Sequence, residues 1–247
     1  HENRSGFDTA HVCDYPHDMR IATRLVPTVA LAALVGSCAS AGRKATWERE
    51  PAEAEAAAAP TEGVDTAALA DEAEALWAER DDRAKLEAAI EAWEKLVAAE
   101  PKNADALIKL ARAHYFLADG FLALEDGQQE VEFEVYKSGV DFGERALLVL
   151  EPGFEADMRA GKSFEEAISS ITEEGMPAAY WYCANLGRFA SKQGLSERLY
   201  YKDKLKTAME RIRALDPTFY YGAADRYLGV FSSLLPGIAG RDTDKSA

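Results

Sequence analysis

The segment AIEAWEKLVAAEPKNADALIKLARAHYFLA, residues 89–118, has the clearest helical pattern of the chain. Its apolar side chains recur every three or four residues, the spacing that places them on one face of an α-helix. Pro101 interrupts the pattern because a helix does not continue comfortably into proline, and Asn103 suits the N-cap of the next helix. The segment therefore predicts two successive helices joined by a short turn.

The same helical spacing continues from Asp65 to the end of the chain, and no alternating strand pattern interrupts it. Before Pro101 the sequence is similar to the end of a tetratricopeptide repeat (TPR). A leucine followed by a small residue recurs where helices would cross closely, as Leu110-Ala111, Leu186-Gly187 and Leu228-Gly229. We therefore expect an all-α fold, an α-solenoid of divergent TPR-like helix pairs over residues 65–247, with insertions at 119–135 and 154–177. GRDTDKSA (240–247) resembles the start of a further helix, so we expect this domain to be truncated at its C-terminus.

Residues 19–37 have the order of a signal peptide. Arg20 and Arg24 precede an apolar run that is too short to span a bilayer. Val35-Gly36-Ser37-Cys38 then resembles the lipobox of bacterial lipoproteins, which implies lipid attachment at Cys38. An ordinary signal peptide is the alternative.

The neighbouring segments follow from this assignment. A signal peptide should start the chain, so residues 1–18, which precede Met19, are expected to be upstream translation rather than native sequence. Residues 38–64 are rich in alanine, glutamate and proline and are expected to form a flexible tether.

The composition excludes several functions. With 43 acidic and 28 basic residues in 247, the net charge of −15 argues against nucleic acid and against electrostatic docking on an anionic membrane. His114 is the only histidine after residue 18, which argues against a histidine-rich metal site, and we expect it to be packed between helices. No phosphate-binding loop or nucleophile elbow is present, so we expect neither a cofactor nor an enzyme.

Two segments carry a more specific resemblance. They are AAYWYCANLGRFA (178–190) and ALDPTFYYGAADRYLGVFSSLLPGIAGRDTDKSA (214–247). They resemble the T component of TRAP transporter systems, the TatT family of TRAP-associated TPR lipoproteins, in the Tyr-Trp helix, the Tyr-Tyr-Gly turn and the Leu-Gly helix. Arg241, beside Gly240, departs from the pattern, because the family more often has a second glycine there.

The resemblance implies a periplasmic, all-helical lipoprotein that is not an enzyme. It implies a solute-binding P component as partner, association as a homotrimer, and transfer of a small ligand toward a permease. Ala39 is not aspartate, which by analogy favours the outer membrane over the inner membrane.

In proteins resembling TPR arrays, the first helix of each pair lines a concave groove. Aligning the repeats on their Leu-small pairs places five candidate ligand-binding residues in that groove: Arg112, Tyr115, Trp181, Arg188 and Arg226. Aromatic walls with guanidinium groups suit an anionic or amphipathic small molecule. The competing interpretation is that each arginine pairs with a neighbouring acid.

Two other functions remain open at the level of sequence. A generic TPR scaffold lipoprotein would bind a peptide or partner helix during envelope assembly. An envelope hydrolase is the third class, although the sequence offers no catalytic constellation for it.

Overall fold

A computed structural model of the chain describes residues 43–49 and 63–234, with the backbone alone for residues 231–234. The predicted signal peptide, the lipid-attachment site Cys38, residues 1–18 and the C-terminal residues 235–247 lie outside this part of the chain. Within it, every element is helical, which confirms the all-α prediction.

The longer helices form three pairs, each made of two helices that follow one another in the sequence, and a single helix comes after the third pair. They are α2 (Thr66–Ala78), α3 (Arg83–Ala99), α4 (Ala104–Gly120), α5 (Gln129–Leu150), α8 (Met176–Gln193), α9 (Leu195–Leu215) and α10 (Ala223–Leu234). The short elements are the 3₁₀ turns η1 (Thr46–Glu48) and η2 (Leu122–Leu124) and the helices α6 (Pro152–Arg159) and α7 (Phe164–Ile168).

Local sequence fixes where several helices begin. The Asn103 side chain accepts a hydrogen bond from the Ala106 amide at 3.0 Å, so the predicted cap of α4 is confirmed. Ser163 and Glu166 form the predicted capping box of α7, in which each side chain bonds the other residue's amide. Such caps satisfy amide groups that have no partner inside the helix.

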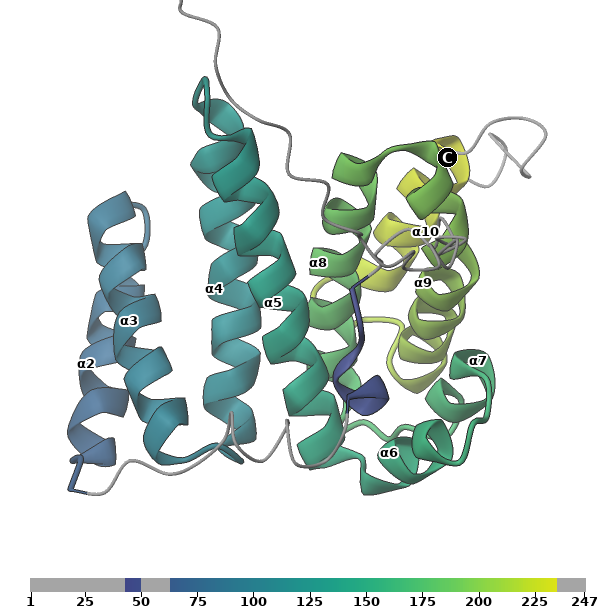
Figure 1. Cartoon of the computed structure of the whole chain (residues 1–247), viewed down its shortest axis with the longest axis horizontal. Helices are drawn as coiled ribbons and strands as arrows, with labels where there is room; N and C mark the ends of the chain where they lie inside the picture. Colours follow the sequence, from purple (N-terminus) through teal and green to yellow (C-terminus); the bar gives the residue numbers. More distant parts are fainter. Residues whose placement is uncertain (1–42, 50–62, 235–247) are drawn as a thin grey trace, which may run out of the picture. The chain divides into compact units, whose positions relative to one another are not determined.

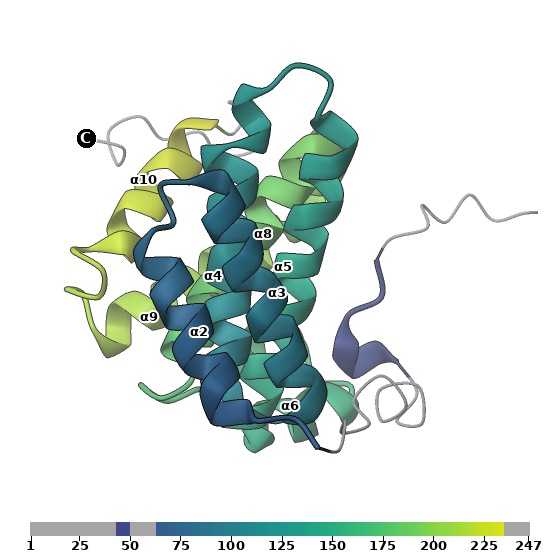
Figure 2. The same cartoon turned by 90° about the vertical axis from the view of Figure 1, so that its left-hand side faces the viewer.

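Each long helix packs against the next long helix along the chain, so α8 packs against α5 (Figure 1). In addition, α8 packs against α4. In the view turned by 90°, α2 and α3 lie nearest the viewer, in front of α4 and α5 (Figure 2). Buried side chains from all these layers join in one large apolar core.

Two glycines bring α5 and α8 into close contact. A β-carbon on Gly143 would collide with the backbone of Tyr182, and one on Gly139 would collide with the Asn185 side chain. The Asn185 amide in turn donates to the Ala111 carbonyl of α4 at 2.9 Å. These contacts tie α4, α5 and α8 together, and α8 carries the site described below.

Residues 43–49 differ from the expected flexible tether. Trp47 is buried, with its ring 5.4 Å from Phe154 and 6.0 Å from Tyr182. Arg43 and Thr46 both bond the buried carboxylate of Glu144 on α5. For these seven residues the tether prediction is wrong, because the lone tryptophan of a polar stretch is a core residue.

The two expected insertions also have defined structure. The second half of residues 119–135 is the first part of α5 rather than a loop. The 154–177 segment forms α6 and α7, and it is fastened by Glu151, whose Oε1 accepts bonds from the amide and hydroxyl of Thr172, each at 2.7 Å.

Candidate functional site

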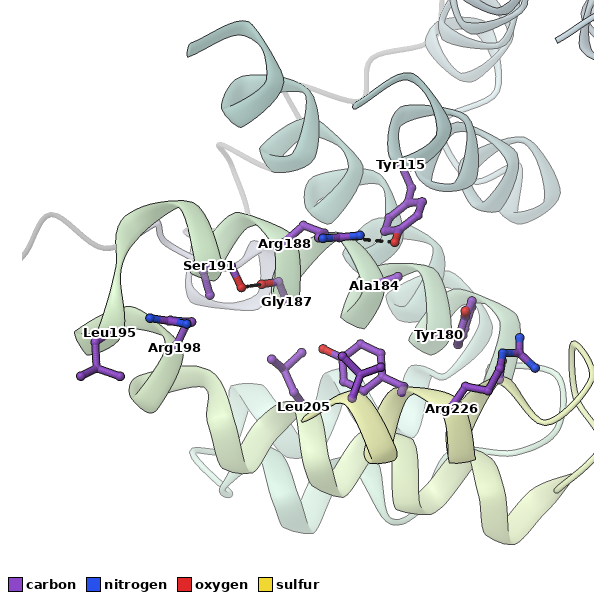
Figure 3. Close-up of a pocket in the computed structure, with 14 residues that line it drawn as sticks. Tyr115, Tyr180, Ala184, Gly187, Arg188, Ser191, Leu195, Arg198, Leu205 and Arg226 are labelled. Carbon is purple, nitrogen blue, oxygen red and sulfur yellow. Dashed lines mark hydrogen bonds between the residues drawn. The ribbon is translucent and has the colours of Figure 1, made fainter. Parts of the chain in front are cut away.

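A pocket of about 330 Å³ lies among α8, α9 and α10, with Tyr115 of α4 at its rim. Its walls are largely apolar and aromatic, and three arginines interrupt them. Figure 3 shows Arg198 at one end of the pocket, Arg226 at the other, and Leu205 between them. An apolar cavity with a few placed polar groups is typical of small-molecule sites, and this one is at the small end of their usual range.

The pocket depends on a close approach between α8 and α10. A β-carbon on Gly187 would collide with the Tyr227 hydroxyl, so glycine at this position allows the tyrosine ring to lie against α8. The Ser191 hydroxyl, one turn further along, donates to the Gly187 carbonyl at 2.8 Å. The predicted role of the Leu186-Gly187 pair as a close-packing point agrees with this geometry.

Arg188 forms one wall of the pocket and is already paired. Its Nη2 lies 2.6 Å from Oδ1 of Asp119, and its Nε donates to the Tyr115 hydroxyl at 3.5 Å. Tyr136 donates to the same Asp119 oxygen at 3.1 Å, and burial raises the pKa of this tyrosine. Arg188 therefore belongs to a polar network that fixes the side of the pocket.

Arg226 holds the turn before α10. Its guanidinium donates to the carbonyls of Tyr220, at 2.9 Å, and of Tyr221. These two tyrosines have φ values of 43° and 60°, in the left-handed region that residues other than glycine rarely occupy. Strained backbone of this kind persists only where surrounding contacts maintain it, and Arg226 supplies two of them.

An aromatic cluster supports this end of the pocket. The Tyr180 ring lines the cavity and lies 5.6 Å from the ring of Phe219 and 5.6 Å from that of Tyr220. Trp181 lies behind them, 5.9 Å from Tyr220 and 5.7 Å from Tyr115. Tyr221, by contrast, is 96% exposed.

A family model described as the TRAP transporter T-component matches residues 80–247, a range that contains the whole pocket. The chain belongs to the TRAP transporter T-component family. A search of curated proteins finds no match to the chain. The members of this family are accessory proteins of TRAP transporters and are not known as enzymes, and the family suggests a location associated with the cell envelope.

Three of the five residues predicted for the groove of this T-component line the pocket: Tyr115, Arg188 and Arg226. The other two do not. Trp181 is only 7% exposed and packs behind the pocket wall. Arg112 lies over aromatic rings, 4.8 Å from the centre of Trp77 and 5.9 Å from that of Trp181, so it packs between helices instead of facing a ligand.

Sequence reasoning missed Arg198, Tyr180 and Tyr227, which all line the pocket. Arg198 was overlooked because it lies on α9, the second helix of its pair, whereas the TPR analogy assigns the groove to first helices. Tyr180 directly precedes the predicted Trp181, so a shift of one residue in the alignment would have found it.

The histidine and the cysteine of the described residues are both buried in the packing between helices. His114 is buried, its Nδ1 donates to the Leu110 carbonyl at 2.9 Å, and burial lowers its pKa to about 4. Cys183 is buried, and burial raises the pKa of its thiol. Among residues 43–49 and 63–234, no group of three or more histidine, cysteine or acidic side chains could hold a metal ion. In the same residues, no helix has the length and apolar character needed to cross a bilayer.

Proposed function

We propose that this T-component is a periplasmic lipoprotein, anchored through Cys38, that binds the solute-binding P component of a TRAP uptake system. We further propose that it takes a small ligand into the pocket among α8, α9 and α10. The observation that carries the proposal is an apolar pocket within the part of the chain that matches the family.

The anchor and location rest on the sequence. A basic and apolar segment leads to Cys38 in the order expected of a lipoprotein signal, and this favours attachment to the envelope, with the outer membrane preferred by analogy. Replacing Cys38 with alanine should release the protein from membranes or leave the signal uncleaved. Unchanged membrane fractionation and unchanged mass would contradict lipid attachment.

The partner surface in this proposal centres on Tyr221. An aromatic side chain that is almost fully exposed, on a turn held by Arg226, is a preorganised contact of the kind that dominates protein interfaces. The turn lies at the pocket end formed by Arg226 and Tyr180, so a bound P component would cover or complete that end.

We also propose that the pairs α2–α3, α4–α5 and α8–α9 are TPR-like units of a solenoid, and that the protein assembles as a homotrimer. The packing of each long helix on its neighbour supports the first proposal, and the family resemblance supports the second. Analytical ultracentrifugation of the mature protein tests the trimer directly, because a monomer at micromolar concentration would contradict it.

Capture from an envelope extract tests the function. The tagged protein should enrich a TRAP solute-binding protein, identified by mass spectrometry. Tyr221→Ala should reduce this enrichment. Tyr200→Ala is the control and should not, because Tyr200 is also exposed but lies on α9, away from this turn. Enrichment of envelope-assembly proteins without any TRAP component would instead favour the generic TPR scaffold.

Native mass spectrometry of the purified protein tests the ligand. Val230 lines the pocket and is 58% exposed, so Val230→Trp should fill the cavity at little cost in stability and abolish a bound small-molecule mass. Val131→Trp is the matched control, since Val131 is a similarly exposed valine of α5 outside the pocket. A bound mass that survives Val230→Trp would place the ligand elsewhere.

A further inference from the structure

The three arginines of the pocket are not equivalent. Arg188 is paired with Asp119 and Tyr115, and Arg226 is bonded to two backbone carbonyls. Arg198 has no ion pair with a carboxylate in the described residues, and its Nε is buried without a hydrogen-bond partner there. A buried donor nitrogen without a hydrogen-bond partner carries a free-energy cost, which an acceptor from a ligand would remove.

The position of Arg198 reinforces the difference. It lies in the first turn of α9, which begins after Gly194 without a side-chain cap. The unsatisfied amides at a helix start carry partial positive charge, and they add to the charge of the guanidinium group. Figure 3 shows Arg198 beside Leu195 and Ser191 at the end of the pocket.

We infer that Arg198 binds the carboxylate of an amphipathic monocarboxylic acid whose apolar part lies along the pocket toward Leu205 and Tyr227. This inference rests on the proposed function, because it specifies the ligand of the same pocket. Of the three arginines that line the pocket, Arg198 alone has no acceptor among the described residues, so the pocket matches one negative charge and not two. Arg198 and Leu205 are seven residues apart on α9, about 10 Å, which suits a medium-length chain or a single aromatic ring.

The apolar part of the ligand has a matching surface. Beyond the Arg198 end, the cavity is lined by Leu205, Tyr227, Tyr180 and Val230. The net charge of −15 disfavours anions in general, so the local guanidinium must supply the selectivity. A charge-assisted hydrogen bond in a partly buried site contributes about tenfold to hundredfold in affinity.

Isothermal titration of the full mature protein with octanoate and with octanamide tests the inference. The two probes have the same chain and differ in charge, so octanoate should bind at least about tenfold more tightly. Arg198→Met, which keeps the apolar stem, should bring the two affinities together, and Arg198→Lys should restore part of the difference. Arg213→Ala, which removes the same charge from the far end of α9, should leave the difference unchanged.

Three results would overturn the inference. Equal binding of both probes would show that the pocket takes apolar ligands without recognising a carboxylate, and the proposed function would stand. If Arg188→Met abolishes octanoate binding and Arg198→Met does not, the carboxylate binds Arg188 and not Arg198. Failure of both probes to bind the wild-type protein would reject the ligand class, while capture of the P component would still decide the proposed function.

Discussion

Arg43 and Glu144 form a bidentate ion pair, although they are 101 residues apart in the sequence. The two guanidinium nitrogens lie 2.8 Å and 2.5 Å from the two carboxylate oxygens. Glu144 is fully buried on α5 and also accepts bonds from the amide and hydroxyl of Thr46. The segment that carries Trp47 is therefore fastened to the helical domain by both a polar and an apolar contact.

Removing one partner of this pair should be strongly destabilising. Glu144→Ala leaves the buried Arg43 guanidinium with Asp141 as its remaining carboxylate partner, and it removes the acceptor of the Thr46 amide and hydroxyl. We expect a loss of about 3 kcal/mol in the free energy of unfolding. Glu134→Ala, on the same helix, removes an exposed ion pair with Lys137 and should cost less than about 1 kcal/mol. Chemical denaturation measures both, and equal effects would contradict the role given to residues 43–49.

The close contact between α5 and α8 should not tolerate a methyl group at Gly143. Gly143→Ala places a β-carbon against the backbone of Tyr182, which cannot move without shifting α8, so we expect a loss of about 1–3 kcal/mol. Gly120→Ala is the control, because its β-carbon would meet open space and should be neutral or slightly stabilising. Thermal melts of the two variants should differ clearly, and a Gly143→Ala protein as stable as wild type would show that the helices are further apart.

Stability should fall as the pH is lowered through the titration of His114. Its pKa is about 4 in the folded protein and 6.5 in the unfolded chain, so between these values the unfolded state binds a proton that the folded state does not. The neutral imidazole of His114 therefore makes its full contribution to the free energy of unfolding above about pH 6.5. This contribution, about 3 kcal/mol, is lost as the pH falls toward 4.

The difference between wild type and His114→Gln isolates this effect. Burial raises the pKa of Glu94, whose carboxylate lies 3.9 Å from the imidazole, but Glu94 is present in both proteins. Urea denaturation at several pH values should give a flatter pH profile for the variant. Parallel profiles from pH 4 to 7 would refute the burial of a neutral imidazole.

Arg226 should control the mobility of the turn that carries Tyr221. Arg226→Ala removes two hydrogen bonds to the carbonyls of Tyr220 and Tyr221, so amide hydrogen exchange in this turn should accelerate by about tenfold. Arg213→Ala, whose ion pair with Asp225 is exposed, should leave the exchange unchanged. Exchange at wild-type rates in Arg226→Ala would mean that the aromatic cluster alone holds the turn.

The helical architecture could be predicted because it depends on local signals. The apolar spacing around Pro101, the Asn103 cap and the Ser163–Glu166 capping box each act within a few residues, and each is found where it was expected. The burial of His114 and Cys183 also followed, since both lie in strongly apolar helical patterns.

Contacts between distant segments were harder to predict. Trp47 stands alone in a polar stretch, and its partners Phe154 and Tyr182 are more than a hundred residues away. Likewise, no local pattern distinguishes Arg112, which packs on Trp77, from Arg198, which faces the pocket. The difference between them arises only when α2, α9 and α10 are placed.

The affinity of the purified protein for a purified TRAP solute-binding protein from the same organism shows whether this T-component acts through a P component. Isothermal titration should give a saturable complex with a dissociation constant in the micromolar range or tighter, and Tyr221→Ala should weaken it by about tenfold or more while Tyr200→Ala does not. If the folded wild-type protein binds none of the TRAP solute-binding proteins of that organism, this T-component does not act through a P component.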